Sequence, residues 1–450
     1  MRSCLLALLL TLAVGTSHAF CGFYVGKADA KLFNEASQVI VVRDGDKTVV
    51  SMLNDYQGEL KEFAVVVPVP TVLQKGQVNV GDKQTFDRLD AYSAPRLAEY
   101  YDPNPCDRRL YEARSAMPMA VPAPATAPQS SKALGVTVEA SFSVGEYDIV
   151  ILSATQSDGL ETWLKHEGYR IPANSAKALA PYIRQNMKFF VAKVNLAEQA
   201  KTGFQSLRPL QFAYESEKFM LPIRLGMANA KGPQDLIAFM LTKNGRVETS
   251  NYRTLKLPAN MDLPVFLKQG DEFRNFYKAM FGEQAKKEGY RAVFTEYFWD
   301  MGWCDPCAAD PLSPEELRKA GVFWVNNPAA SSPPPLPGQG RMIPMPGAQP
   351  VMLTRLHVRY TPETFPEDLM FQETKDRQNF QTRYVLRHPA NVEPEACPEA
   401  KAYLEGVAKR QEQEAQQLAT LTGGDINSIR QKLRLPPATK AKPWWDGLWK

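Results

Sequence analysis

Runs of alternating hydrophobic and polar residues recur along this chain and predict mainly β-structure. The runs are rich in valine, isoleucine and aromatic residues and are bounded by short turns, a pattern typical of strands. Glycine-containing turns at 43–47 and 243–246 indicate hairpins. We expect strands at residues 39–42, 48–53, 63–70, 135–142, 147–154, 188–196, 207–214, 219–225, 236–242, 247–255, 292–299, 322–325, 351–360 and 382–387.

Helical periodicity marks a smaller set of segments. We expect helices at residues 89–101, 160–167, 175–185, 271–288, 314–320, 398–421 and 426–433. The segment 271–288 carries an aromatic stripe on one face, which is more typical of a packed core than of a ligand site. Together the patterns predict an α+β fold of mainly antiparallel β-sheets, or a sandwich, with packed helices and a helical C-terminus.

Composition divides the chain into seven consecutive regions. We expect a signal peptide at 1–19, an N-terminal β-rich region at 20–116, a Pro/Ala-rich linker at 117–134, a central α+β region at 135–327, a Pro-rich loop at 328–350, C-terminal strands and helices at 351–436, and a Trp/Lys tail at 437–450.

The N-terminus has the pattern of a secretory signal peptide. Arg2 precedes an apolar run at 5–14, and small residues lead to a cleavage point after Ala19. We therefore expect a mature protein that begins at Phe20 and is exported, to the periplasm or outside the cell. The apolar run is too short to span a bilayer, and no other stretch is long and apolar enough for a membrane helix.

The charge balance is mild. Lysine and arginine outnumber the acidic residues by 53 to 49, and removal of Arg2 lowers the net charge from +4 to +3. With no basic stripe interleaved with aromatic residues, this argues against a nucleic-acid partner. The tail places Trp444, Trp445 and Trp449 between lysines, which suits contact with a membrane surface or a partner. We favour a tail that folds back on its own domain or stays unattached.

Five cysteines follow the signal peptide: Cys21, Cys106, Cys304, Cys307 and Cys397. In an exported protein they are expected to form disulfides, and their odd number leaves one over. The spacing makes Cys304 and Cys307 the easiest pair. The pairing among the other three is open, and we favour Cys21 with Cys106.

The expected strand at 292–299 leads directly into Trp303-Cys304-Asp305-Pro306-Cys307. This stretch resembles the active-site motif of thioredoxin-like oxidoreductases, in which Cys304 would attack and Cys307 would resolve. Asp305 counts against that chemistry, because a neighbouring negative charge raises the pKa of a thiol. Prolines shortly afterwards would also interrupt the helix that the analogy needs. We therefore favour a structural disulfide.

Other chemistry finds little support in the sequence. His166, His357 and His388 are the histidines after the signal peptide, and none lies at metal-ligand spacing, so we expect no metal and no cofactor. No nucleophile elbow, zinc-protease motif or phosphate-binding loop is present. We expect His357, within a strand pattern, and His388, before Pro389, to be packed or surface residues and not bases. Among 49 acidic residues no glycosidase pair can be chosen, and we name no catalytic residue.

Several motifs resemble a bacterial family known as domain of unknown function number 2330. They are Phe63-Ala-Val-Val-Val-Pro-Val-Pro70, Glu99-Tyr-Tyr-Asp-Pro-Asn-Pro-Cys106, Tyr147-Asp-Ile-Val-Ile-Leu152, Trp163-Leu-Lys-His-Glu-Gly-Tyr169, Thr295-Glu-Tyr-Phe-Trp-Asp300 with the cysteine pair that follows, and Arg383-Tyr-Val-Leu-Arg-His-Pro389. The resemblance extends over about 21–433. It implies export, and it carries no activity or site residues.

The sequence leads to two functional hypotheses. The first is an exported envelope or extracellular protein with a non-enzymatic binding or structural role, whose partner is an envelope or extracellular protein or a ligand. The alternative is a thiol–disulfide oxidoreductase that uses Cys304 and Cys307.

Overall fold

The structure is a computed structural model, and it describes residues 23–27, 33–34, 37–53, 56–57, 63–107, 138–153, 157–170, 175–202, 207–229, 232–302, 305, 310–325 and 349–435. The expected signal peptide, the Pro/Ala-rich linker, the Trp/Lys tail and all but the end of the Pro-rich loop lie outside these residues.

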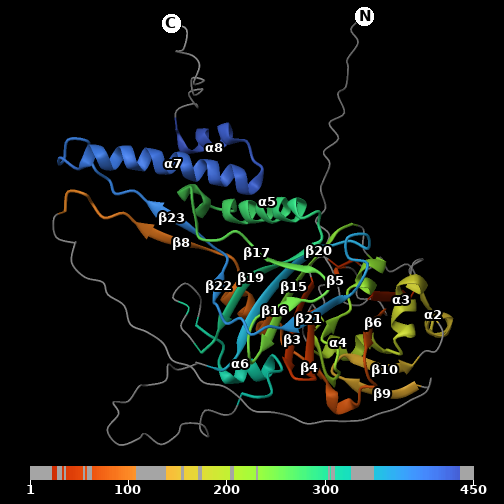
Figure 1. Ribbon diagram of the computed structural model, residues 1–450. Coiled ribbons are helices and arrows are strands. Elements are labelled where there is room, and N and C mark those ends of the chain that lie inside the picture. The colour runs from red at the N-terminus through yellow and green to blue at the C-terminus, as the bar shows by residue number, and fades with distance from the viewer. Residues whose placement is uncertain are drawn as a thin grey trace, which may run out of the picture.

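Two β-sheets stacked face to face form the body of the protein (Figure 1). The first sheet is antiparallel and has the order β11-β1-β6-β12-β10-β9. Its strands are β1 (Phe23–Lys27), β6 (Phe63–Val69), β9 (Val138–Val144), β10 (Tyr147–Ser153), β11 (Tyr169–Arg170) and β12 (Lys188–Val194).

The second sheet has nine strands and mixed directions. Its order is β17-β19-β20-β15-β3-β4-β13-β7, and β22 also pairs with β19. The strands are β3 (Ser37–Asp44), β4 (Lys47–Leu53), β7 (Val78–Val80), β13 (Leu210–Glu215), β15 (Gln234–Thr242), β17 (Arg253–Lys256), β19 (Ala292–Asp300), β20 (Met352–Tyr360) and β22 (Phe380–Gln381).

Period-two alternation along the strands places the core between the two sheets. In β3, Val39 and Val41 face the six-stranded sheet, whereas Ile40 and Val42 face the helices on the other side. In β6, Val65 belongs to the same inter-sheet core. Both faces of these strands are therefore buried, which explains why their sequences are almost continuously apolar.

Helices cover the outer face of each sheet. The six-stranded sheet is covered by α2 (Ser157–His166) and α3 (Ser175–Arg184). One part of the nine-stranded sheet is covered by α1 (Lys83–Ser93) and α6 (Pro314–Lys319), and another part by α5 (Glu272–Lys287).

A C-terminal layer packs on the far side of α5 (Figure 1). It contains α7 (Ala400–Thr422), α8 (Ile426–Leu433) and a parallel sheet of β18 (Met261–Leu263), β23 (Arg383–His388) and β8 (Arg96–Tyr101). The remaining elements are β2 (Phe33–Asn34), β5 (Tyr56–Gln57), β14 (Met220–Leu221), β16 (Val247–Thr249), β21 (Leu369–Glu373), α4 (Leu196–Lys201), and the 3-10 helices Lys75–Gln77, Arg224–Asn229 and Val265–Lys268.

The α+β fold, the mainly antiparallel sheets and the helical C-terminus expected from the sequence are confirmed. The helix expected at 89–101 is wrong in its second half. There α1 ends at Ser93 and β8 begins at Arg96, because Ala94 precedes Pro95 and adopts an extended conformation. The strand expected at 322–325 is absent, and that at 219–225 shortens to β14.

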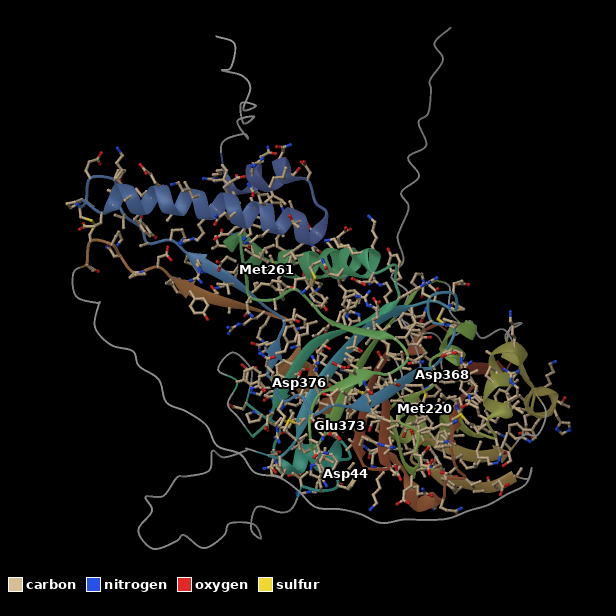
Figure 2. The ribbon with its side chains drawn as sticks, in the orientation of Figure 1. Asp44, Met220, Met261, Asp368, Glu373 and Asp376 are labelled. Atoms are coloured by element: carbon tan, nitrogen blue, oxygen red, sulfur yellow. A yellow bond between two sulfur atoms is a disulfide. The ribbon has the colours of Figure 1, made fainter. Side chains whose placement is uncertain are left out.

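The hairpin expected around 243–246 is also wrong. β15 pairs with β3 and β20, whereas β16 pairs with β21. The turn is instead held from outside: Lys243 Nζ lies 2.5 Å from Asp44 Oδ2, the Asn244 N–H donates to Glu373 Oε1 at 2.7 Å, and the Arg246 N–H donates to the Asp376 carbonyl at 2.9 Å. Figure 2 shows Asp44, Glu373 and Asp376 at one end of the nine-stranded sheet. Tertiary contacts thus override the local turn signal.

Gly321 provides a test of how α6 is seated on the nine-stranded sheet. Its φ is +99°, and a Cβ there would lie 2.6 Å from Val49 Cγ1. We expect Gly321→Ala to lower the free energy of unfolding by about 3 kcal/mol. Gly270→Ala is the matched control, because Gly270 also has positive φ but open space around it; it should cost about 1 kcal/mol. Urea denaturation measures both, and equal losses would contradict the close approach to Val49.

Candidate functional site

The loop with the two closely spaced cysteines begins where β19 ends. Cys304 and Cys307 lie outside the described residues, so their disulfide and their alternative redox role stay predictions. Asp305, which lies between them, is described and buried. Its Oδ2 accepts hydrogen bonds from Tyr297 Oη at 3.1 Å and from Gln381 Nε2 at 2.9 Å. The carboxylate therefore anchors the loop to β19 and β22.

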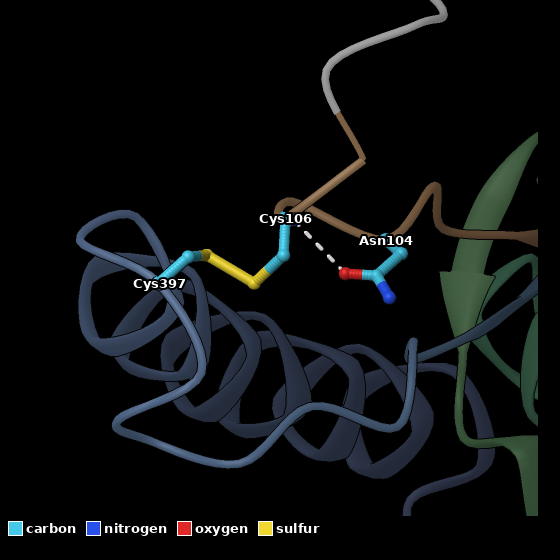
Figure 3. Close-up of a disulfide and its surroundings, with 3 residues drawn as sticks. All are labelled: Asn104, Cys106 and Cys397. Atoms are coloured by element: carbon cyan, nitrogen blue, oxygen red, sulfur yellow. Dashed lines mark hydrogen bonds between the residues drawn. A yellow bond between two sulfur atoms is a disulfide. The ribbon is translucent and has the colours of Figure 1, made fainter.

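A disulfide joins Cys106, just beyond β8, to Cys397, just before α7 (Figure 3). The two Cα atoms are 5.7 Å apart, although 291 positions separate the residues in sequence. The pairing of Cys21 with Cys106 is therefore wrong, and Cys21 itself lies outside the described residues. The reason is topological: β8 and β23 are parallel neighbours, so the chain leaves both strands in the same direction.

A buried cluster of polar side chains lies between the nine-stranded sheet and α5. We call it the Glu296 cluster; it consists of Tyr277, Glu296, Arg355 and His357. Arg355 Nε donates to Glu296 Oε2 at 2.5 Å, and His357 Nδ1 lies 2.6 Å from Oε1. Tyr277 Oη, from α5, also donates to Oε1. Only 1% of the Glu296 side chain is exposed.

A β-bulge in β19 and the alternation of side chains between the two faces of β20 bring these groups together. Thr295 pairs with Leu356 and Tyr297 pairs with Arg355, so Glu296 is the extra residue of a bulge in β19. A bulge re-aims the side chain of its extra residue. In β20, Leu356 packs into the inter-sheet core, and the alternating positions at Arg355 and His357 therefore face α5.

Further charges neutralise the edges of the Glu296 cluster. Arg355 Nη1 donates to Asp90 Oδ1 of α1 at 2.6 Å. Arg359 forms a two-pronged ion pair with Asp235, at 2.7 and 2.6 Å. The ring of Phe281 stacks on His357 with their centroids 3.7 Å apart. Strands β15, β19 and β20 and helices α1 and α5 are thereby connected through one charged layer.

The ionisation states follow from the surroundings. Burial would raise the pKa of Glu296, but Arg355 and His357 outweigh it and lower that pKa to about 2. Burial and the Glu296 carboxylate raise the pKa of Tyr277 well above its usual value. Glu296 is thus ionised at neutral pH. Because a carboxylate only accepts hydrogen bonds, His357 Nδ1 carries the hydrogen between them.

A histidine held by a carboxylate in this way resembles a general base in its orientation. His357 Nε2, however, is buried and has no hydrogen-bond partner among the described residues; it lies 3.8 Å from Asp235 Oδ1. With Phe281 stacked on the ring, the geometry suits an anchor for α5 better than a base that meets a substrate. In the described part of the chain, no three His, Cys, Asp or Glu side chains gather as metal ligands would.

His357 is buried within β20, the packed one of the two positions left open by the sequence. His388 lies 2.8 Å from Glu99, and His166 is exposed. The partners of His357 were not identified from the sequence. The available signal was the regular placement of Arg355, His357 and Arg359 at alternate positions of an otherwise apolar strand, which requires buried carboxylates opposite them.

The ion pair in the Glu296 cluster can be tested by removing one partner. We expect Arg355→Met to lower the free energy of unfolding by about 3–5 kcal/mol, because it leaves a buried carboxylate without its main cation. Adding Glu296→Gln should restore a substantial part of the loss. Denaturant titration of both variants at pH 7 measures this, and a double variant less stable than Arg355→Met alone would contradict the pairing.

Glu414 in α7 provides a pH-dependent test of the C-terminal layer. Its side chain is 3% exposed, and burial, opposed by Arg410 and reinforced by Asp262 and Asp102, raises its pKa from 4.5 to about 7. A raised pKa means that the folded state holds the proton more tightly. The protonated Glu414 therefore contributes up to about 3 kcal/mol to the free energy of unfolding. This contribution is fully present below pH 4.5 and is lost as the pH rises through about 7.

We expect Glu414→Gln to remove this loss of stability and to raise the unfolding free energy at pH 8. Glu405→Gln, on the exposed face of the same helix, is the matched control and should keep the pH dependence of the unmodified protein. Denaturant titration between pH 4 and 8 compares them. Identical pH profiles for Glu414→Gln and the unmodified protein would refute the assignment.

Among the described residues, no helix has both the length and the apolar character needed to cross a membrane. Two similar solved structures are both of a mutated baculovirus P35 after caspase cleavage, at 11% and 12% identity and TM-scores of 0.27 and 0.26. Each match covers 45% of this chain, and the matches span 65% and 64% of those chains. Similarity at this level supports no conclusion about the fold or the function of this chain.

No curated protein matches the chain. A family model described as an uncharacterized protein conserved in bacteria (DUF2330) matches residues 15–372. The matched range includes both sheets of the sandwich apart from β22, and it ends before β23, α7 and α8. Because the match covers well over half of the sequence, this chain belongs to the bacterial DUF2330 family.

Proposed function

We propose that the protein is exported to an oxidising compartment and acts there as a non-enzymatic binding or structural module. The observation that carries this proposal is the disulfide between Cys106 and Cys397. Disulfides persist in the periplasm and outside the cell, whereas cytosolic reductants remove most of them. The signal-peptide pattern at 1–19 points to the same compartment.

The placement of the disulfide supports a mechanical role. It closes a loop between residues 291 positions apart, for which chain-entropy arithmetic gives roughly 6 kcal/mol of stabilisation. Near the bond, α7 is also held by Asp102, which accepts from Tyr403 Oη and from Arg410 Nη2, each at 2.7 Å. The bond thus fastens the segment before α7 to the segment after β8.

The Glu296 cluster supports a non-enzymatic role. A group that transfers protons must come within hydrogen-bond distance of a substrate. Glu296 and Arg355 are instead enclosed and neutralise each other, and Tyr277 ties them to α5. The hydrogen bonds and the ion pair of these residues hold helices against the sheet. We therefore place the binding function on the surface of the protein.

Disulfide mapping tests the proposal. We expect the protein, produced with its own leader and recovered from the periplasm or medium, to yield a cross-linked peptide containing Cys106 and Cys397. Cys106→Ser should lower the free energy of unfolding by up to roughly 6 kcal/mol, and Cys397→Ser should have the same effect. The double variant should lose no more than either single variant, because one bond is involved. Recovery of both thiols in reduced form from native cells would overturn the proposal.

A further inference from the structure

Helix α7 is held in different ways along its length. Its C-terminal half shares an apolar core with α5, and the α7 side chains of that core all lie at Ala415 or beyond. In the N-terminal half, residues 400–414, the buried side chains are Ala400, Val407 and Glu414, and none of them belongs to that core. The N-terminal half is therefore held by contacts other than the apolar core of α5.

Asp102, in the segment after β8, is a polar anchor of the N-terminal half of α7. Its Oδ2 accepts hydrogen bonds from Tyr403 Oη and from Arg410 Nη2, each at 2.7 Å. Tyr403 Oη in turn accepts from the Ala390 N–H at 2.7 Å. Hydrogen bonds and an ion pair thus join this half of the helix to the segments that follow β8 and β23.

The charged side chains around Glu414 do not balance. They are Arg410 on the same helix, Asp102, Asp262 of β18 and Arg387 of β23. Arg410 is bonded to Asp102, and Arg387 Nε donates to Asp262 Oδ1 at 2.9 Å. Two arginines therefore face three carboxylates, and Glu414 is the carboxylate that is left without an arginine of its own.

The other helices packed on α7 bring no further cation to Glu414 among the described residues. Glu283 and Lys287 of α5 lie beside the last turn of α7. Arg430 of α8 is paired with Glu412, with its Nε 3.0 Å from Oε2. The imbalance of charge at Glu414 therefore stays uncompensated.

The surroundings of Glu414 suit a protonated side chain better than an ionised one. The side chain is 3% exposed, and its Oε1 lies 3.5 Å from Arg410 Nε. That contact is not a hydrogen bond, and both atoms are buried without a hydrogen-bond partner in the described part of the chain. A buried carboxylate costs free energy unless a cation or hydrogen bonds compensate it, and taking up a proton removes that cost.

We propose that Glu414 is a proton-dependent latch for the N-terminal half of α7. While Glu414 holds a proton, this half stays closed over β18 and the segment after β8. When the proton leaves, this half opens locally, and the sandwich and the C-terminal half of α7 stay in place. The disulfide between Cys106 and Cys397 tethers the opened segment at its start. The latch is a regulatory device beyond the proposed binding function, and no ligand is needed to operate it.

The direction of the response follows from the pKa of Glu414, which burial raises from 4.5 to about 7. Opening exposes the side chain to water, so the closed form binds the proton more tightly than the open form. Raising the pH from 4.5 to about 7 therefore favours opening.

Native-state hydrogen exchange of the purified, disulfide-intact protein tests the latch. We expect the protection factors of amides in residues 404–414, corrected for intrinsic exchange, to fall roughly tenfold or more between about pH 5 and about pH 8. At the higher pH this segment should exchange faster than β3 and β20. Its exchange should also be insensitive to urea below about 1 M, because a local opening exposes little surface. Equal protection and equal urea dependence in the segment and in these strands would overturn the proposal, because Glu414 would then titrate only with global unfolding.

Variants separate the latch from a general loosening of α7. Glu414→Gln should keep high protection at both pH values, whereas Glu405→Gln, on the exposed face, should behave like the unmodified protein. Asp102→Asn frees Arg410 for Glu414, so the midpoint of the fall should move to lower pH by roughly one unit or more. Tyr403→Phe removes a hydrogen bond but no charge, and it should weaken protection without moving the midpoint.

Protection of β3 and β20 shows that each variant folds. An unmoved midpoint in Asp102→Asn, or the same fall with pH in Glu414→Gln as in the unmodified protein, would refute the latch.

Discussion

The ion pair between Glu296 and Arg355 is the constraint around which the protein is arranged. A carboxylate so deeply buried costs several kcal/mol unless cations and hydrogen-bond donors surround it. In this chain the donors come from β20 and α5, and Arg355 in turn requires Asp90 of α1. The position of two helices is thus coupled to one bulge in β19. Directional hydrogen bonds to the buried carboxylate add to apolar packing in fixing where these helices lie.

The same layer links the sandwich to the C-terminal helices. Phe281 of α5 stacks on His357 on one side, while α5 shares an apolar core with α7 and α8 on the other. Strands β8 and β23 belong to the C-terminal layer, and the disulfide joins the segment after β8 to the segment before α7. The C-terminal layer is therefore connected to the body through α5, and the disulfide braces the layer internally, between the end of β8 and the start of α7.

The sequence was sufficient where a local pattern and its environment agree. Most strands of the sandwich, α5, α6 with its capping box, and the break between α7 and α8 at Gly423 follow from periodicity and capping residues. Strands β1, β7, β11 and β22 were not predicted. Prediction failed where distant segments decide the outcome. The turn at 243–246 has the residues of a hairpin, but β20 and β3 occupy the places beside β15.

The candidate sites depend even more strongly on contacts between distant segments, which local sequence patterns do not reveal. Cys106 and Cys397 become neighbours only because β8 and β23 run in parallel, and no spacing rule encodes that topology. Arg355, His357 and Arg359 were the exception. Two arginines and a histidine at alternate positions of an apolar strand indicate buried carboxylates, although the pattern does not say which ones.

The bond between Cys106 and Cys397 has a consequence for how the molecule survives damage. Any single break of the backbone between these two residues would leave both pieces covalently joined. The enclosed stretch includes most of both sheets, together with the loops that connect them. A protein nicked there by an extracellular protease would still migrate as one species without reductant, and its two fragments would stay close enough to keep the sandwich assembled.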